Sequence, residues 1–235
     1  MIELFPEGFE EVEAADGLEL VAYTDARGEE RLWQAFGGGA RAEDVEPGWE
    51  ERWRRFHRGA KVGPVWVGPP WERAQSGLVA VVIDPGAAFG TGAHPTTRLA
   101  IELLATVRRG SLLDVGCGSG VVAVAGALLG FEPVAAVDVE PQAIGETERN
   151  AAANAVRVDV WCADALVVDL PAMDVVVANI TLAAVEALGL RVTSRSLVTS
   201  GYLASDIPSL PGWERVERRE LDGWAADLHQ RPVRR

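Results

Sequence analysis

The chain has few of the residues that build disulfide frameworks and metal sites. Of its 235 residues, two are cysteine and three are histidine. Cys117 and Cys162 form no C-x-x-C pair, so we expect two reduced, mostly buried thiols in a cytoplasmic protein. The histidines are scattered and share no ligand spacing with the cysteines, and no metal site is expected.

The sequence also has no long apolar run and no basic leader. No stretch reaches 18 consecutive apolar residues, which predicts no transmembrane helix and no membrane partner. The N-terminal MIELFPEGFEEVE is acidic, unlike a secretory signal. The hydrophobic content of 48% suffices for one large domain, or for a large and a small one.

Positive charge is scarce, and the acidic charge is unevenly distributed. The formal net charge is -13, and residues 1–50 hold 14 acidic and three basic side chains. Residues 51–64 carry +4. Phosphates repel so acidic a chain, so no direct nucleic-acid binding is expected. The acidic first 50 residues could attract a basic protein, although on charge alone a solvated surface is the favoured interpretation.

The most informative stretch is LLDVGCGSG, residues 112–120. Gly116, Gly118 and Gly120 stand between an apolar strand-like run and an apolar helix-like run, where backbone can approach a nucleotide closely. A dinucleotide fingerprint would need a glycine where Val121 stands. Asp114 would repel a pyrophosphate but suits an ammonium group. The run therefore favours S-adenosylmethionine, which has no phosphate, over a dinucleotide. A glycine turn without any ligand is the alternative.

Strands and helices alternate from residue 78 onward, which predicts a parallel sheet covered on both faces. The last two strands, joined by Asp222-Gly223, predict a hairpin. Thr96 and Thr97 are expected to cap the first helix. The expected strands are 78–84, 111–116, 133–139, 159–163, 175–180, 197–202, 215–221 and 224–230, and the expected helices are 98–109, 121–129, 141–154 and 182–188.

The region before residue 78 predicts a separate small unit. Strands are expected at 19–23 and 31–36. A helix is expected at 48–58, where Trp49, Trp53 and Phe56 recur at helical spacing. We therefore divide the chain into a small acidic domain with a connecting helix (1–61), a Pro- and Gly-rich linker (62–77) with a short strand at 65–67, and a large domain (78–235).

Polar side chains end three of the apolar strands, where ligands of open parallel sheets bind. Asp138 could accept hydrogen bonds from ribose hydroxyls, or cap the following helix. Asp164 could accept from an adenine amino group, or belong to a loop. Asn179 would be costly to bury unpaired, which favours a functional role over a turn-forming one. The loop FGTG at 89–92 could also approach a ligand, although alone it is a weak signal.

Four segments together carry a resemblance to a known family. They are DPGAAFGTGAHPTTRLAIELL (84–104), LLDVGCGSGVVAVAGALLG (112–130), AVDVEPQAIGETERNAAAN (136–154) and VVVANI (175–180). The chain resembles the ribosomal protein L11 methyltransferases. The resemblance implies a Rossmann-like class I methyltransferase domain, S-adenosylmethionine as methyl donor, and a basic ribosomal protein as partner and substrate. The acceptors would be lysine side-chain and N-terminal amines.

The resemblance also implies cofactor-binding residues. Thr97, Gly116, Asp138 and Asn179 occupy the family's cofactor positions and match in residue type. With Asp114, Gly118 and Gly120 of the glycine run they form the predicted cofactor site. No dedicated general base is evident, and Asn179 and His94 are weak catalytic candidates.

One part of the chain departs from the family. The acidic N-terminal unit, implied to recognise the substrate, is short, and its first strand is expected to be missing or reduced to MIELF. The predicted fold is thus an α/β methyltransferase sheet with helices on both faces, plus a small, truncated α+β domain. Two alternatives stay open: a related enzyme with another protein or small-molecule amine as acceptor, and a cofactor-binding protein without catalysis. The sequence indicates no oligomeric state.

Overall fold

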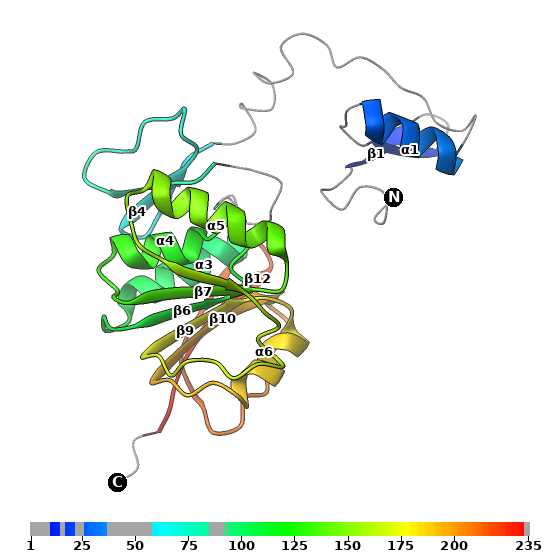
Figure 1. Ribbon diagram of the computed structural model, residues 1–235. Coiled ribbons are helices and arrows are strands. Elements are labelled where there is room, and N and C mark those ends of the chain that lie inside the picture. Colours follow the sequence, from blue (N-terminus) through cyan, green and yellow to red (C-terminus); the bar gives the residue numbers. More distant parts are fainter. Residues whose placement is uncertain are drawn as a thin grey trace. The chain divides into compact units, whose positions relative to one another are not determined.

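The computed structural model describes residues 10–14, 17–21, 26–36, 58–84, 92 and 94–232 (Figure 1). The chain divides into two compact units, Met1–Arg55 and Phe56–Arg235. Trp49, Trp53 and Phe56, which we expected on a helix at 48–58, lie outside the described residues. The predicted division at residues 61 and 77 stays a prediction.

The first unit contains a hairpin and a helix. Strands β1 (Glu10–Ala14) and β2 (Gly17–Val21) pair antiparallel, and α1 (Ala26–Phe36) follows. The predicted strand at 19–23 overlaps β2, whereas the strand predicted at 31–36 is wrong because those residues belong to α1. Leu32, Ala35 and Phe36 recur at helical rather than alternating spacing, which agrees with the observed helix.

The second unit is built on a seven-stranded sheet in the order β11-β12-β10-β9-β6-β7-β8. Strands β10, β9, β6, β7 and β8 are parallel to one another, and β12 is antiparallel to both of its neighbours, β10 and β11. The predicted parallel sheet and terminal hairpin are confirmed. The strands are β6 (Leu112–Val115), β7 (Val134–Asp138), β8 (Asp159–Cys162), β9 (Val175–Asn179), β10 (Ser196–Leu203), β11 (Glu214–Leu221) and β12 (Trp224–Gln230).

Helices cover both faces of this sheet, as the sequence predicts (Figure 1). The helices α3 (Pro95–Thr106), α4 (Val121–Leu128) and α5 (Pro141–Ala153) lie on one face, and α6 (Leu182–Gly189) lies on the other. Neighbouring residues of one strand serve opposite faces: Leu112 joins the apolar cluster under α3 and α4, and Leu113 joins the cluster under α6. Burial on both faces explains why these strands are apolar throughout.

A second, three-stranded sheet precedes the large one. It consists of β3 (Ala60–Val62), β4 (Val65–Gly68) and β5 (Val79–Val82). Val62, Val65 and Val67 are buried in the same apolar cluster as α3 and α4. Part of the expected linker at 62–77 therefore forms strand, and these residues pack within the second unit.

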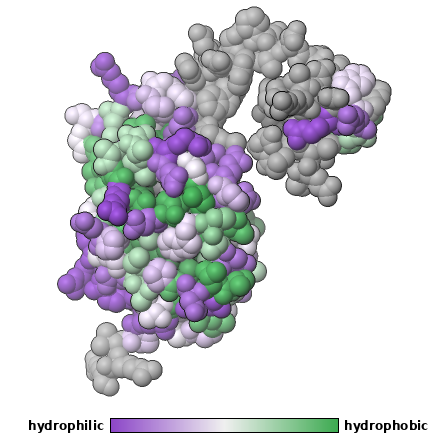
Figure 2. Space-filling view, viewed as in Figure 1, coloured by the Kyte–Doolittle hydropathy of each residue, from purple (hydrophilic) through white to green (hydrophobic). Residues whose placement is uncertain are grey.

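The surface of the second unit is mixed in character. Small groups of apolar residues lie between hydrophilic ones on the face shown in Figure 2. The large apolar side chains exposed on this unit are Val139, Val167, Leu190, Leu203, Ile207 and Val216. No helix in the described part of the chain is long and apolar enough to cross a membrane.

Candidate cofactor site

The strand order of the large sheet reverses direction at β6. β6 pairs with β7 on one side and with β9 on the other. The chain therefore winds away in opposite directions from β6, and ligands of open α/β sheets bind at the carboxyl ends of strands beside such a point. Gly116, Asp138 and Asn179 follow or end these three strands, so the fold brings the three predicted residues to one edge.

The turn after β6 needs its glycines. Gly116, Gly118 and Gly120 have φ of 71°, 52° and 78°, in the left-handed region that other residues avoid. A Cβ at Gly116 would collide with Ile180, which follows β9. Gly120 is the N-cap of α4. The three glycines, spaced two residues apart in the sequence, thus supply three positive φ angles just before α4.

Asp138, at the end of β7, is bonded to this turn. Its Oδ2 accepts a hydrogen bond from Gly118 N–H at 2.9 Å, and its Oδ1 accepts from Glu140 N–H at 3.0 Å. A carboxylate has about four acceptor positions, so Asp138 can hold the turn and still accept from ligand hydroxyls.

Asn179 and Thr97, 82 residues apart, are in contact. The Asn179 Nδ2 donates to Thr97 Oγ1 at 3.3 Å. Thr97 lies in the first turn of α3 with only 1% of its surface exposed. Two predicted residues from distant segments therefore meet beside the glycine turn.

His94 is the N-cap of α3, a role that we predicted for Thr96 and Thr97. The prediction is wrong because Pro95 occupies the first helical turn and favours an extended residue before it. His94 Nδ1 accepts from Thr96 N–H at 3.3 Å, and the ring lies edge-on to Trp224. Burial lowers the pKa of His94, which favours the neutral ring. With Nδ1 used as the cap, any role as a base falls to Nε2.

Asp114 lies beneath the turn with 2% of its surface exposed. Its Oδ2 accepts from Ala123 N–H, in the first turn of α4, at 3.0 Å. Burial, aided by the nearby charge of Asp138, raises the pKa of Asp114 to about 7, although the hydrogen bond from Ala123 acts in the opposite direction. The structure thus gives Asp114 a role in supporting the helix, and its predicted contact with a ligand ammonium stays a prediction.

The sequence missed two residues of α5 that hold the turn. Thr147 Oγ1 donates to the Gly118 carbonyl at 3.0 Å, and Asn150 Nδ2 donates to the Ser119 carbonyl at 2.8 Å. Both side chains are buried, on the same face of α5 as Ala143 and Ala151. Polar residues among the alanines of a buried helix face were the available signal.

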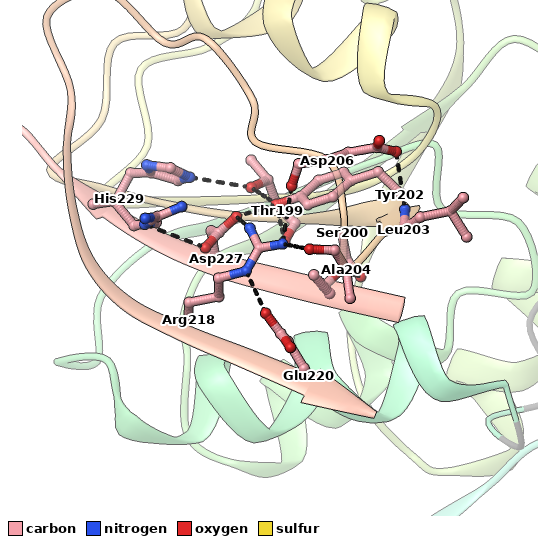
Figure 3. A network of polar contacts seen from close by, with 12 residues as sticks. Thr199, Ser200, Tyr202, Leu203, Ala204, Asp206, Arg218, Glu220, Asp227 and His229 are labelled. Atoms are coloured by element: carbon pink, nitrogen blue, oxygen red, sulfur yellow. Dashed lines mark hydrogen bonds and ion pairs between the residues drawn. The ribbon is translucent and has the colours of Figure 1, made fainter. Parts of the chain in front are cut away.

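A buried polar network was also missed (Figure 3). Asp227 of β12 is fully buried, and its Oδ2 accepts from Arg218 Nη1 and Tyr202 OH, each at 2.9 Å. Arg218 Nη2 donates to the carbonyls of Ala204 and Asp206, directly after β10. Because β10 runs parallel to β9, this network fixes a loop at the same edge as Asn179.

The remaining predicted positions contribute less. Asp164 is exposed, and its Oδ1 accepts from Leu166 N–H at 2.8 Å, as in a turn. Cys117 is buried, but the expectation is wrong for Cys162, which is exposed because it ends the outermost strand β8. Phe89 to Thr91 lie outside the described residues. Within the described ranges, no three His, Cys, Asp or Glu side chains are grouped to hold a metal ion.

The strand order, the helices on both faces and the glycine turn after β6 define a class I methyltransferase fold. A crystal structure of ribosomal protein L11 methylase from Lactobacillus delbrueckii subsp. bulgaricus is similar, with a TM-score of 0.65 and 25% identity. The similarity covers 74% of this chain and 99% of that one. The predicted fold class is confirmed.

The sequence comparisons narrow the class to a family. The family model "Ribosomal protein L11 methyltransferase (PrmA)" matches residues 16–208. The ribosomal protein L11 methyltransferase of Symbiobacterium thermophilum is 37% identical over 203 residues, covering 80% of this chain and 67% of that protein. That of Thiobacillus denitrificans is 43% identical over 148 residues, covering 60% of this chain and 49% of that protein. The chain belongs to the ribosomal protein L11 methyltransferase family, and it spans about half to two thirds of these relatives.

Proposed function

We propose that the protein transfers methyl groups from S-adenosylmethionine to lysine side-chain and N-terminal amines of ribosomal protein L11. The observation that carries the proposal is the meeting of Thr97 and Asn179 beside the glycine turn and Asp138. Hydroxyl, amide, carboxylate and backbone groups can form hydrogen bonds with a nucleoside that carries an amino-acid group. Membership of the methyltransferase family supports the same reaction.

The site suits S-adenosylmethionine better than a dinucleotide. Two acidic side chains, Asp114 and Asp138, lie near the turn and close enough to each other for the charge of Asp138 to raise the pKa of Asp114. They would repel a pyrophosphate, whereas S-adenosylmethionine has none. The glycine turn would contact the ligand with its backbone, Asp138 would accept from the ribose hydroxyls, and Thr97 and Asn179 would border the methyl-transfer end.

The main contribution of the protein to the reaction is to position the acceptor amine relative to the methyl group. Bound S-adenosylmethionine would supply a methyl group already activated by its sulfonium. Holding an amine in line with that group can contribute about 7–11 kcal/mol. The amine must be neutral to attack, although free lysine has a pKa of about 10.4. Burial beside a positive charge lowers that pKa, so the site itself favours the reactive form.

Asn179 is proposed to orient the acceptor amine. Its Nδ2 donates to Thr97 Oγ1, which fixes the plane of the amide. The Oδ1 of the same amide could accept a hydrogen bond from the incoming amine and direct its lone pair toward the methyl group. Thr97 is buried and belongs to α3, so its side chain can hold the Asn179 amide in one orientation.

The acceptor is proposed from the family and from charge. Residues 1–50 hold 14 acidic and three basic side chains, a surface that favours a basic protein. The first unit, Met1–Arg55, is proposed to recognise the ribosomal protein, and the second unit to hold the cofactor.

Methyl transfer from labelled S-adenosylmethionine to ribosomal proteins tests the proposal. The proteins are taken from cells that lack this enzyme, and the labelled band is identified by mass spectrometry. We expect label in ribosomal protein L11, at amines. Label in another protein would favour the related enzyme with a different acceptor, and cofactor binding without any transfer would favour the non-catalytic alternative. Asn179→Ala should lower turnover at least tenfold, and wild-type turnover would remove its assignment.

A further inference from the structure

We infer that α5 shapes the cofactor site, with Thr147 and Asn150 as positioning residues that hold the glycine turn in its binding conformation. The inference rests on the proposed function, because it takes the turn after β6 as the place where S-adenosylmethionine binds. Neither residue is expected to touch the reacting atoms. Both act through the backbone of the turn.

The contacts fix two consecutive peptide groups. Thr147 Oγ1 donates to the Gly118 carbonyl at 3.0 Å, and Asn150 Nδ2 donates to the Ser119 carbonyl at 2.8 Å. The two side chains are three residues apart, so they project from one face of the helix. Because peptide groups are planar, fixing these carbonyls also fixes the directions of the N–H groups on their other sides.

Direct packing supports the same coupling. Gly120 lies so close to Thr147 that an added Cβ would come within 2.9 Å of the Thr147 Cβ and 2.8 Å of its Oγ1. Thr147 and Asn150 are 0% and 3% exposed, so their hydrogen bonds are shielded from water. A buried side chain that lost its carbonyl partner would be costly, which makes the turn conformation stiff.

Asn150 also joins the turn to a second segment. Its Oδ1 accepts from Asp84 N–H at 3.1 Å, where the chain leaves β5. Asn154, the C-cap of α5, binds β5 too: its Oδ1 accepts from Val82 N–H, and its Nδ2 donates to the Val82 carbonyl and to the backbone carbonyl of Asn150. The described hydrogen bonds of Asn154 do not reach the glycine turn. The two asparagines therefore form a matched pair.

The variants Asn150→Ala, Thr147→Val and Asn154→Ala test the inference in the full-length protein. The measurements are the Kd for S-adenosylmethionine by calorimetry and the thermal midpoint Tm. We expect Asn150→Ala and Thr147→Val each to raise Kd about tenfold, the change that one lost hydrogen bond gives. Asn154→Ala should change Kd less than about twofold, yet lower Tm as much as Asn150→Ala, since its hydrogen bonds hold β5.

Thr147→Val keeps the volume of the side chain and is expected to fold even where Asn150→Ala does not. Thr147→Ser keeps the hydroxyl and should restore most of the affinity. Wild-type Kd in Thr147→Val, or an equal rise in Kd for Asn154→Ala, would overturn the inference. A wild-type protein that binds no S-adenosylmethionine would instead refute the proposed function.

Discussion

Asp114 shows how one buried carboxylate makes the stability of this protein depend on pH. Its only described hydrogen bond comes from Ala123 N–H, and its pKa is raised by burial from an ordinary 3.8 to about 7. The folded protein therefore binds this proton more tightly than the unfolded chain. It follows that the free energy of unfolding falls as the pH rises from about 4 to about 7.

Replacing Asp114 with Asn should remove this pH dependence. The Asn Oδ1 can still accept from Ala123 N–H, but no charge has to be buried. At pH 8 Asp114→Asn should be more stable than the wild type by up to about 4 kcal/mol, and at pH 4 the two should be nearly equal. Urea unfolding between pH 4 and pH 8 measures both curves. Parallel curves would show that Asp114 does not titrate in this range.

Gly201 is required by a close approach of two strands. It has a φ of 98° in the bulge between Ser200 and Tyr202 of β10. A Cβ there would lie 2.7 Å from the Ile180 carbonyl carbon, next to Asn179. Gly201→Ala should therefore cost about 2–4 kcal/mol of unfolding free energy, from the strained φ and the backbone clash together.

Gly223 is the matched control for this prediction. Its φ is 80°, but an added Cβ would meet no described atom within 4 Å. Gly223→Ala should therefore cost only about 1 kcal/mol, the price of the φ angle alone. Chemical unfolding of both variants separates the two effects. Equal losses would mean that the approach of Ile180 does not constrain position 201.

At the level of the residue, the sequence predicted which polar side chains meet at the carboxyl ends of the strands, and their binding of the cofactor stays a prediction. Asp138 and Asn179 close apolar runs, and a parallel sheet brings such ends together. It did not predict Thr147 and Asn150, because their partners are backbone carbonyls 29 and 31 residues away. Backbone partners leave no trace in the sequence of a turn.

The elements of the large sheet were predicted within one or two residues, because apolar runs bounded by glycine, proline and aspartate mark them clearly. The element α1 was mispredicted, since a six-residue window at 31–36 is too short to separate a period of 2 from one of 3.6. The pairing of β3 with β4 and β5 was not predicted because β3 and β4 are only three and four residues long.

A buried ion pair joins β11 to β12. Asp227 is completely buried and bonded to Arg218, whose side chain is 16% exposed (Figure 3). Asp227→Ala would leave the Arg218 guanidinium without its buried partner and should cost about 3–5 kcal/mol. The exposed pair Arg157–Asp159 is the control, because Asp159→Ala should cost less than about 1 kcal/mol. Similar losses in urea unfolding would contradict a special role for the network.

In the whole molecule, the acidic first 50 residues and the predicted cofactor-site residues belong to different parts of the sequence. The first 50 residues hold 14 of the 35 acidic side chains, and the glycine turn, Asp138 and Asn179 all belong to the second unit. A long-range attraction for a basic protein is screened by salt, since the Debye length falls from about 10 Å at 0.1 M to about 3 Å at 1 M. Cofactor binding at the partly buried glycine turn, as proposed, should be screened much less.

Raising the salt concentration should therefore weaken binding of the protein substrate more than binding of S-adenosylmethionine. Between 50 mM and 500 mM salt, the KM for ribosomal protein L11 should rise at least several-fold, while the Kd for S-adenosylmethionine stays within about twofold. The double variant Glu11→Gln, Glu13→Gln should flatten the salt dependence of KM. A control with the same change in net charge, Glu132→Gln and Asp169→Asn, places it on exposed positions of the second unit and should leave the slope unchanged. A KM that does not change with salt, or equal effects of the two double variants on its salt dependence, would mean that the acidic segment is only a solvated surface.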